Sequence, residues 1–215
     1  MKKLLQISLA LATVFAAGTA LAQDVKAGEK KIAMCIGCHG IVGYQASFPE
    51  VHKVPMIAGQ NAKYLVSALN DYAKGERKHP GMRGIAATLT EQDMADIAAY
   101  YEQQAQVPAV PEAIAAPSTQ VAELLTKGAC VSCHGANFSK PIDPGYPKLA
   151  GQHGDYLAVA LKAYKTEGNA KVGRGNAIMA GQVKQFSVAE LKAIAGYIGS
   201  LPGELRTVPQ NKFRW

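Results

Sequence analysis

Two copies of the motif Cys-x-x-Cys-His carry the clearest chemistry in this sequence. They occupy residues 35–39 and 130–134. In such a motif the two thiols add across the vinyl groups of a haem, and the adjacent imidazole binds the iron. The chain has four cysteines, so the two motifs use all of them. The sequence therefore predicts two covalently bound haem c groups, held by Cys35, Cys38 and His39 in the first copy and by Cys130, Cys133 and His134 in the second.

A zinc site and a redox dithiol are the other functions that a Cys-x-x-Cys pair can have. Zinc would require a further pair of ligands for each copy, and no Cys or His pair follows at the spacing of a zinc finger. A thioredoxin-like dithiol lies among alternating strands and helices, whereas the flanks of both motifs are typical of helix or loop. Duplication of the complete motif favours haem attachment.

The chain contains one domain repeated in tandem. Residues 55–60 (Pro-Met-Ile-Ala-Gly-Gln) recur as residues 147–152 (Pro-Lys-Leu-Ala-Gly-Gln). The segments that follow, 61–72 and 153–164, have apolar residues at positions i, i+3, i+4 and i+7, which is typical of a helix. No alternating strand pattern of useful length is present. These patterns predict an all-α fold.

Capping residues predict where several helices begin. Ser187-x-x-Glu190 fits a capping box before the last helix of the second copy, and Thr90-x-x-Asp93 is a looser form of it in the first. Plausible caps also precede the two haem-attachment motifs, at Asp24 and Ser118.

The repeat also predicts the sixth ligand of each iron. Methionine is the usual partner of histidine in electron-transfer haems, where its thioether raises the reduction potential. Met82 aligns with Met179, each in a glycine-containing loop before the last helix of its copy, and the other methionines of the first copy have no such counterpart. We therefore expect His39 and Met82 on the first iron, and His134 and Met179 on the second.

Three further histidines and two prolines bear on the surroundings of the irons. His153 is expected to cap a helix or to lie at the surface, whereas His79 and His52 leave bis-histidine ligation open for the first haem. A histidine ligand needs an acceptor for its second ring nitrogen. The backbone carbonyls of Pro55 and Pro147 are the candidates.

The ends and the middle of the chain predict its organisation. Residues 1–22 combine two lysines, an apolar stretch and the small-residue sequence Ala20-Leu-Ala22, which is the pattern of a secretory signal peptide. Three prolines between the two copies predict a linker. The expected organisation is a signal peptide over 1–22, an N-terminal domain over 23–104, a linker over 105–117 and a C-terminal domain over 118–215. Because bacteria attach c-type haem outside the cytoplasm, we expect the protein in the periplasm.

The charge of the chain is a weak guide to its partners. The 23 Lys and Arg residues against 16 Asp and Glu residues give a formal net charge of +7. Two propionates on each haem would offset much of it, so binding to nucleic acid is not expected. Most of the excess lies in the second half, where a basic face could steer an acidic redox partner or simply be a solvated surface.

The tandem motifs, the Pro-x-x-x-Gly-Gln loops and the late methionines resemble the cytochrome c4 family. Residues 81–86 (Gly-Met-Arg-Gly-Ile-Ala) and 98–101 (Ala-Ala-Tyr-Tyr) are especially similar to it. The resemblance implies two class I cytochrome c domains whose haems lie close to one another, with their propionates within hydrogen-bonding reach. It also implies electron delivery from a quinol-oxidising complex of the quinol–cytochrome c reductase type to a terminal oxidase.

An electron carrier requires no nucleophile and no proton-transfer group, and we expect neither an enzyme nor a small-molecule substrate. One alternative is the haem subunit of a periplasmic dehydrogenase, such as a flavocytochrome that oxidises sulfide. A less favoured one is a dihaem enzyme, such as a peroxidase or a thiosulfate-oxidising protein, because such enzymes generally expose an iron or use a cysteine ligand. Peripheral association with a membrane is left open.

Overall fold

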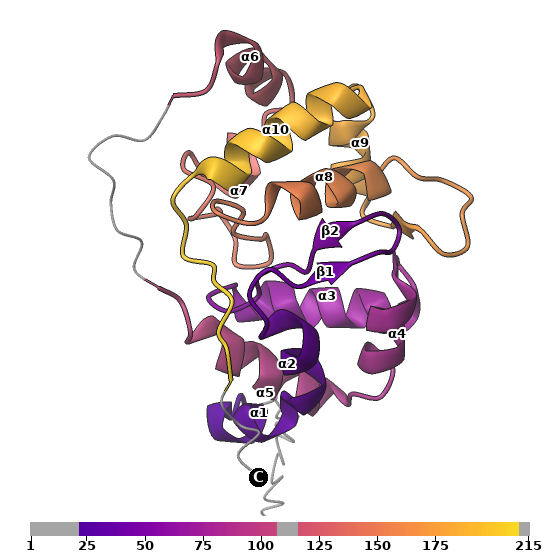
Figure 1. The fold of residues 1–215 in the computed structure, drawn as a ribbon, viewed down its shortest axis with the longest axis vertical. Coiled ribbons are helices and arrows are strands. Elements are labelled where there is room, and N and C mark those ends of the chain that lie inside the picture. Colours follow the sequence, from indigo (N-terminus) through magenta and orange to yellow (C-terminus); the bar gives the residue numbers. More distant parts are fainter. Residues whose placement is uncertain (1–21, 107–115, 211–215) are drawn as a thin grey trace, which may run out of the picture.

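The computed structural model describes residues 22–106 and 116–210. Nearly all of the expected signal peptide and most of the expected linker lie outside these residues. The described part forms two small helical domains stacked on one another (Figure 1). None of its helices is long and apolar enough to cross a membrane.

The described residues of each domain form five helices. Those of the first are α1 (Val25–Lys31), α2 (Ala33–His39), α3 (Ala62–Lys74), α4 (Pro80–Ala86) and α5 (Glu91–Glu102). Those of the second are α6 (Thr119–Lys127), α7 (Val131–His134), α8 (Gly154–Ala163), α9 (Ala177–Val183) and α10 (Val188–Ser200). Four two-residue strands complete the described elements: β1 (Gln45–Ala46), β2 (His52–Lys53), β3 (Arg77–Lys78) and β4 (Gly173–Arg174).

The predicted helix starts are present. The Asp24 carboxylate accepts hydrogen bonds from two backbone N–H groups at the start of α1, and the Ser118 side chain accepts one at the start of α6. Ser187 forms the predicted capping box before α10. Thr90 also forms a complete capping box with Asp93 before α5, so the last helices of the two domains are capped in the same way.

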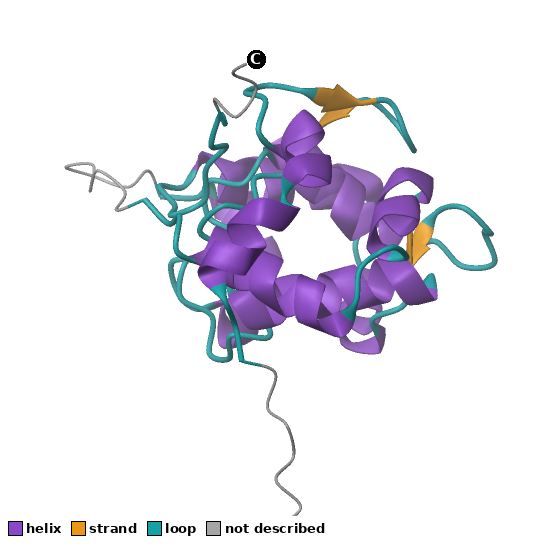
Figure 2. Ribbon diagram, turned by 90° about the horizontal axis from the view of Figure 1, so that it is seen from below, coloured by secondary structure: helices purple, strands orange, loops and turns teal. Residues whose placement is uncertain are grey.

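The core of each domain lies between its last helix and the other long helices. In the first domain α5 packs on α1 and α3, and in the second α10 packs on α8 and α6. Gly28 of α1 is required for the first of these contacts, because a Cβ atom there would lie 2.0 Å from the carbonyl oxygen of Asp96 on α5. Figure 2 shows the helices around the interior, with the strands outside them.

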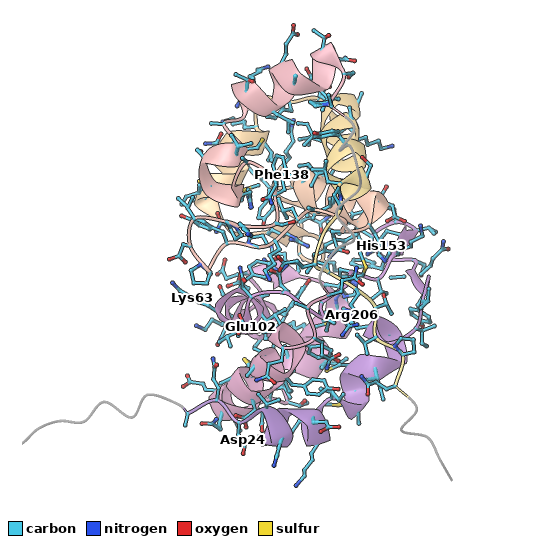
Figure 3. The ribbon with its side chains drawn as sticks, turned by 90° about the vertical axis from the view of Figure 1, so that its left-hand side faces the viewer. Asp24, Lys63, Glu102, Phe138, His153 and Arg206 are labelled. Carbon is cyan, nitrogen blue, oxygen red and sulfur yellow. The ribbon has the colours of Figure 1, made fainter. Side chains whose placement is uncertain are left out.

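The two domains share a hydrogen-bonded interface. Strand β3 of the first domain pairs antiparallel with β4 of the second, with Arg77 opposite Arg174. The chain after α10 then crosses back to the first domain, where the Arg206 N–H donates to the Ala58 carbonyl over 3.1 Å (Figure 3). Strands of two residues are too short to leave an alternating pattern, which is why the sequence did not reveal this pairing.

Candidate haem-binding sites

The first domain contains a cavity of about 470 Å³ beside the first Cys-x-x-Cys-His motif. Cys35, Cys38 and His39 from α2 line it, together with Met82 from α4. The rest of its wall is mainly apolar and comes mostly from α3, α5, residues between 44 and 60, and residues between 147 and 157 of the second domain. The residues predicted to hold the first haem therefore line one cavity.

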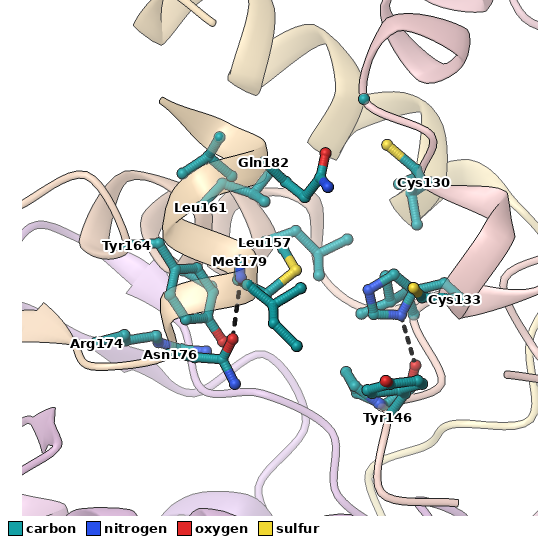
Figure 4. Close-up of a pocket in the computed structure, with 18 of the residues that line it drawn as sticks. Cys130, Cys133, Tyr146, Leu157, Leu161, Tyr164, Arg174, Asn176, Met179 and Gln182 are labelled. Carbon is teal, nitrogen blue, oxygen red and sulfur yellow. Dashed lines mark hydrogen bonds between the residues drawn. The ribbon is translucent and has the colours of Figure 1, made fainter. Parts of the chain in front are cut away.

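The second domain repeats this arrangement around a cavity of about 190 Å³. Cys130, Cys133 and His134 line it from the segment around α7, and Met179 lines it from α9. Figure 4 shows the Met179 thioether pointing into the space in front of Cys133. The structure therefore also brings together the four residues predicted to hold the second haem.

Both motif histidines are oriented by a backbone carbonyl. His39 Nδ1 lies 2.8 Å from the Pro55 oxygen, and His134 Nδ1 lies 3.2 Å from the Pro147 oxygen, as the repeat predicted. A carbonyl can only accept, so Nδ1 carries the proton and Nε2 keeps a free lone pair. Burial lowers the pKa of both imidazoles, which favours the neutral form that binds metals.

The two late methionines are positioned by equivalent helix caps. The Met82 N–H donates to His79 Nδ1 over 3.2 Å, and the Met179 N–H donates to Asn176 Oδ1 over 2.9 Å. His79 and Asn176 are therefore equivalent N-cap residues, His79 for α4 and Asn176 for α9. The Nδ1 atom of His79 is thus already the acceptor of a hydrogen bond.

The other two histidines lie differently. His52 is buried at the edge of the first cavity, and its Nδ1 donates to the Glu50 carbonyl over 2.8 Å. His153 stands at the cap position of α8, but its side chain accepts no capping hydrogen bond, and it lines neither cavity.

Sequence reasoning missed a cluster of arginines and tyrosines at the domain interface. Arg77 donates to the Tyr64 hydroxyl over 3.0 Å, and Arg174 donates to the Tyr156 hydroxyl over 3.0 Å. Arg77, Tyr64 and Tyr156 line both cavities, whereas Arg174 lines the second. The two arginines occupy equivalent positions in the repeat. Each comes two residues before the residue that caps the methionine-bearing helix, and this recurrence is visible in the sequence.

The guanidinium groups have little negative charge beside them. An oxygen of Asp71 lies 3.5 Å from Arg77 Nε, and no described carboxylate forms an ion pair with Arg174. Each guanidinium instead lies over two tyrosine rings, at 5.2–5.7 Å from the ring centroids. Buried charge of this kind normally has an anionic partner, so the cluster is suited to bind carboxylates.

Comparison with known proteins agrees with this geometry. The family model "Cytochrome c" matches residues 25–104 and 118–202. Cytochrome c4 of Stutzerimonas stutzeri is 33% identical over 196 residues, which cover 84% of this chain and 90% of that protein. Cytochrome c4 of Pseudomonas aeruginosa is 32% identical over 210 residues, which cover 94% of this chain and 100% of that protein.

A solved structure has the same fold. The crystal structure of reduced recombinant cytochrome c4 from Pseudomonas stutzeri superposes with a TM-score of 0.64 and 32% identity, covering 84% of this chain and 100% of that one. Two cytochrome c domains, each with its own attachment motif, define a dihaem c-type cytochrome with two covalent haem c groups. This chain belongs to the cytochrome c4 family, and like its relatives it is an electron carrier.

Proposed function

We propose that each cavity holds its haem iron between the motif histidine and the late methionine. Cys35 and Cys38 would form the thioethers of the first haem, with His39 and Met82 on its iron. Cys130 and Cys133 would form those of the second, with His134 and Met179 on its iron. The haem, when bound, supplies one-electron chemistry by cycling between ferric and ferrous iron.

The residues of each cavity fit this group. Two thiols, an imidazole with a free Nε2 and a thioether are the donors that a His/Met c-type haem requires, and all four line one cavity in each domain. The apolar walls exclude water from the iron. Arg77 and Arg174 supply the positive charge that the propionates would need at the domain interface.

We further propose a periplasmic carrier that accepts electrons from a quinol-oxidising complex and delivers them to a terminal oxidase. The signal-peptide pattern supports the periplasmic location, and the cytochrome c4 relatives support the role as an electron carrier. The single observation that carries the proposal of a carrier is the presence of a histidine and a methionine in both cavities. A protein with two six-coordinate irons has no open position for a substrate.

The spin state of the purified ferric holoprotein tests this proposal. We expect optical and paramagnetic-resonance spectra of two low-spin haems that do not change on addition of cyanide or peroxide at low concentration. Met82→Ala and Met179→Ala should each convert one haem to a readily ligated form and lower its potential. A high-spin or peroxide-reactive haem in the unmodified protein would contradict the carrier assignment and favour a dihaem enzyme.

A second electron donor has specific support. The protein described as "Thiosulfate dehydrogenase electron acceptor" in Stutzerimonas stutzeri strain A1501 is 32% identical over 189 residues, which cover 81% of this chain and 82% of that protein. A thiosulfate-oxidising enzyme could therefore be the donor in place of a quinol-oxidising complex. Stopped-flow reduction by the two purified donors, compared at equal concentration, distinguishes the two routes.

A further inference from the structure

The hydroxyl of Tyr101 is a buried polar group that has no partner in the protein. Tyr101 is 4% exposed and lines the first haem cavity from α5. Its oxygen forms no hydrogen bond with any described residue. Buried hydroxyl groups are nearly always hydrogen-bonded, so an unpartnered one that lines a cofactor cavity indicates a hydrogen bond that is completed when the cofactor is attached.

The sulfur of Cys35 is the candidate for that hydrogen-bond partner. Cys35 packs against the same buried cluster as Tyr101, and the two side chains are close enough to influence one another's ionisation. Burial raises the pKa of the Cys35 thiol to about 11, with the Tyr101 hydroxyl acting against this shift. Burial also raises the pKa of Tyr101, so its hydroxyl keeps its proton.

Haem attachment changes what this sulfur can do. A thiol can donate or accept a hydrogen bond, whereas a thioether sulfur has no proton and can only accept. The protonated hydroxyl of Tyr101 can then only be the donor. The direction of the hydrogen bond is fixed by this chemistry.

The second domain has no hydroxyl at the position of Tyr101, although its Ser132 hydroxyl lies 3.8 Å from the Cys133 sulfur. The residue of α10 that corresponds to Tyr101 is Ile198, which lines the second cavity and carries no polar atom in its side chain. The two cavities also differ in volume and in other lining residues, among them His79 of the first and Phe186 of the second. The Tyr101 hydroxyl is therefore one difference between the surroundings of the two haems.

We propose that Tyr101 donates a hydrogen bond to the Cys35 sulfur of the attached haem and thereby raises the reduction potential of the first haem. This inference depends on the proposed attachment of that haem at Cys35. A hydrogen bond to the sulfur withdraws electron density from the haem and favours the ferrous state. Tyr101 is thus a positioning and tuning residue of the first haem alone.

The test is Tyr101→Phe in the full-length holoprotein. Proton NMR during a redox titration follows the two haems separately and gives a potential for each. We expect a negative shift of the first haem's potential and no shift of the second. Equal potentials in the variant and the unmodified protein would overturn the proposal, because the hydroxyl would then bond only to a trapped water or to nothing.

The matched control is Tyr100→Phe. Tyr100 is the neighbouring tyrosine on α5, but it lines neither cavity, and its hydroxyl accepts a hydrogen bond from Gln210 over 3.1 Å. Its removal should leave both potentials unchanged. A shift as large as that of Tyr101→Phe would show that any hydroxyl on this helix has the same effect, and would also overturn the proposal.

A measurement on the unmodified protein covers the case in which Tyr101→Phe does not fold. The Tyr101 hydroxyl proton should exchange slowly with solvent, and its NMR resonance should shift when the first haem is oxidised. A rapidly exchanging or unshifted proton would overturn the proposal. Two attached, low-spin haems in the same sample would show that the proposed ligands hold while only this inference fails.

Discussion

Gln60 and Lys148 are joined by two hydrogen bonds of opposite direction across the domain interface. The Gln60 side chain donates to the Lys148 carbonyl over 2.9 Å and accepts from the Lys148 N–H over 2.9 Å. The repeat provides the same exchange between Gln152 and Met56, at 2.8 and 3.0 Å. Both glutamines are 4% exposed. The last residue of each Pro-x-x-x-Gly-Gln loop therefore binds the equivalent loop of the other domain.

We predict that Gln60→Ala weakens the interface. The substitution leaves the N–H and the carbonyl of Lys148 without their partners, and each buried unpaired group costs about 1–3 kcal/mol. Urea unfolding of the holoprotein should show a loss of about 2 kcal/mol or a transition that splits in two. The exposed Gln120 on α6 provides the control, and Gln120→Ala should change stability by less than about 0.5 kcal/mol. Equal effects of the two substitutions would contradict the role of Gln60.

The caps of α4 and α9 lead to a prediction about the methionines. His79→Ala should lower local stability by about 1 kcal/mol and should allow Met82 to dissociate more often from the iron that we propose it binds. The red absorption band of the methionine–iron bond should weaken for the first haem. His79→Asn should restore it, because Asn176 forms the same cap in the second domain. Failure of His79→Asn to restore the band would show that His79 acts otherwise than as a cap.

The position of Arg77 leads to a prediction about both potentials. Arg77 lines both cavities, so its charge disfavours the ferric state of each haem. Arg77→Gln should lower both potentials by an amount worth about 1 kcal/mol for each electron. Arg77→Lys keeps the charge and should lie nearer the unmodified protein. Lys171→Gln, at an exposed position before β4, should have little effect in spectroelectrochemical titrations because solvent screens its charge.

The candidate haem-binding residues that line the cavities could be located from the sequence because haem attachment depends on local spacing. Cys-x-x-Cys-His is contiguous, and alignment of the repeat selected Met82 and Met179, which line the two cavities in the structure. The same alignment identified the Pro55 and Pro147 carbonyls, which accept from the motif histidines in the structure. The long helices were predictable for a similar reason, since caps and apolar periodicity are local signals. The expectation that Met82 and Met179 lie in loops was wrong, because both lie in short helices, α4 and α9.

The interface could not be predicted, because it depends on how the two domains meet. Gln60 and Gln152 were visible as a repeated pair, but nothing in the sequence showed that each binds the other domain. The chain after α10 returns to the first domain, where Lys148 and Glu204 form an ion pair of 2.6 Å beside this contact. Tyr101 gave no signal, because its counterpart in the repeat is apolar and both residues fit a helix stripe.

A buried carboxylate in the first domain leads to a prediction about pH. Asp96 is 2% exposed, and it accepts hydrogen bonds from the Lys31 ammonium, the Asp24 N–H and the Gln92 amide at 2.7–2.9 Å. Burial alone would raise the pKa of Asp96, but the hydrogen bonds outweigh it and lower the pKa below 3.8. The charged form is therefore the one that the folded protein stabilises.

The sign of the pH effect follows from this lowered pKa. The contribution of Asp96 to stability is complete above its unfolded pKa of about 4, and it is lost as the pH falls toward the lower folded pKa. Asp96→Asn should lower the free energy of unfolding by about 2 kcal/mol at pH 7. This loss is smaller than for a fully buried ion pair, because the Lys31 side chain is one-third exposed. Unfolding curves of the variant and the unmodified protein should converge between about pH 5 and pH 3. Glu167→Gln, at an exposed carboxylate, is the control. A difference in stability between Asp96→Asn and the unmodified protein that stays constant across this pH range would contradict an ionised Asp96.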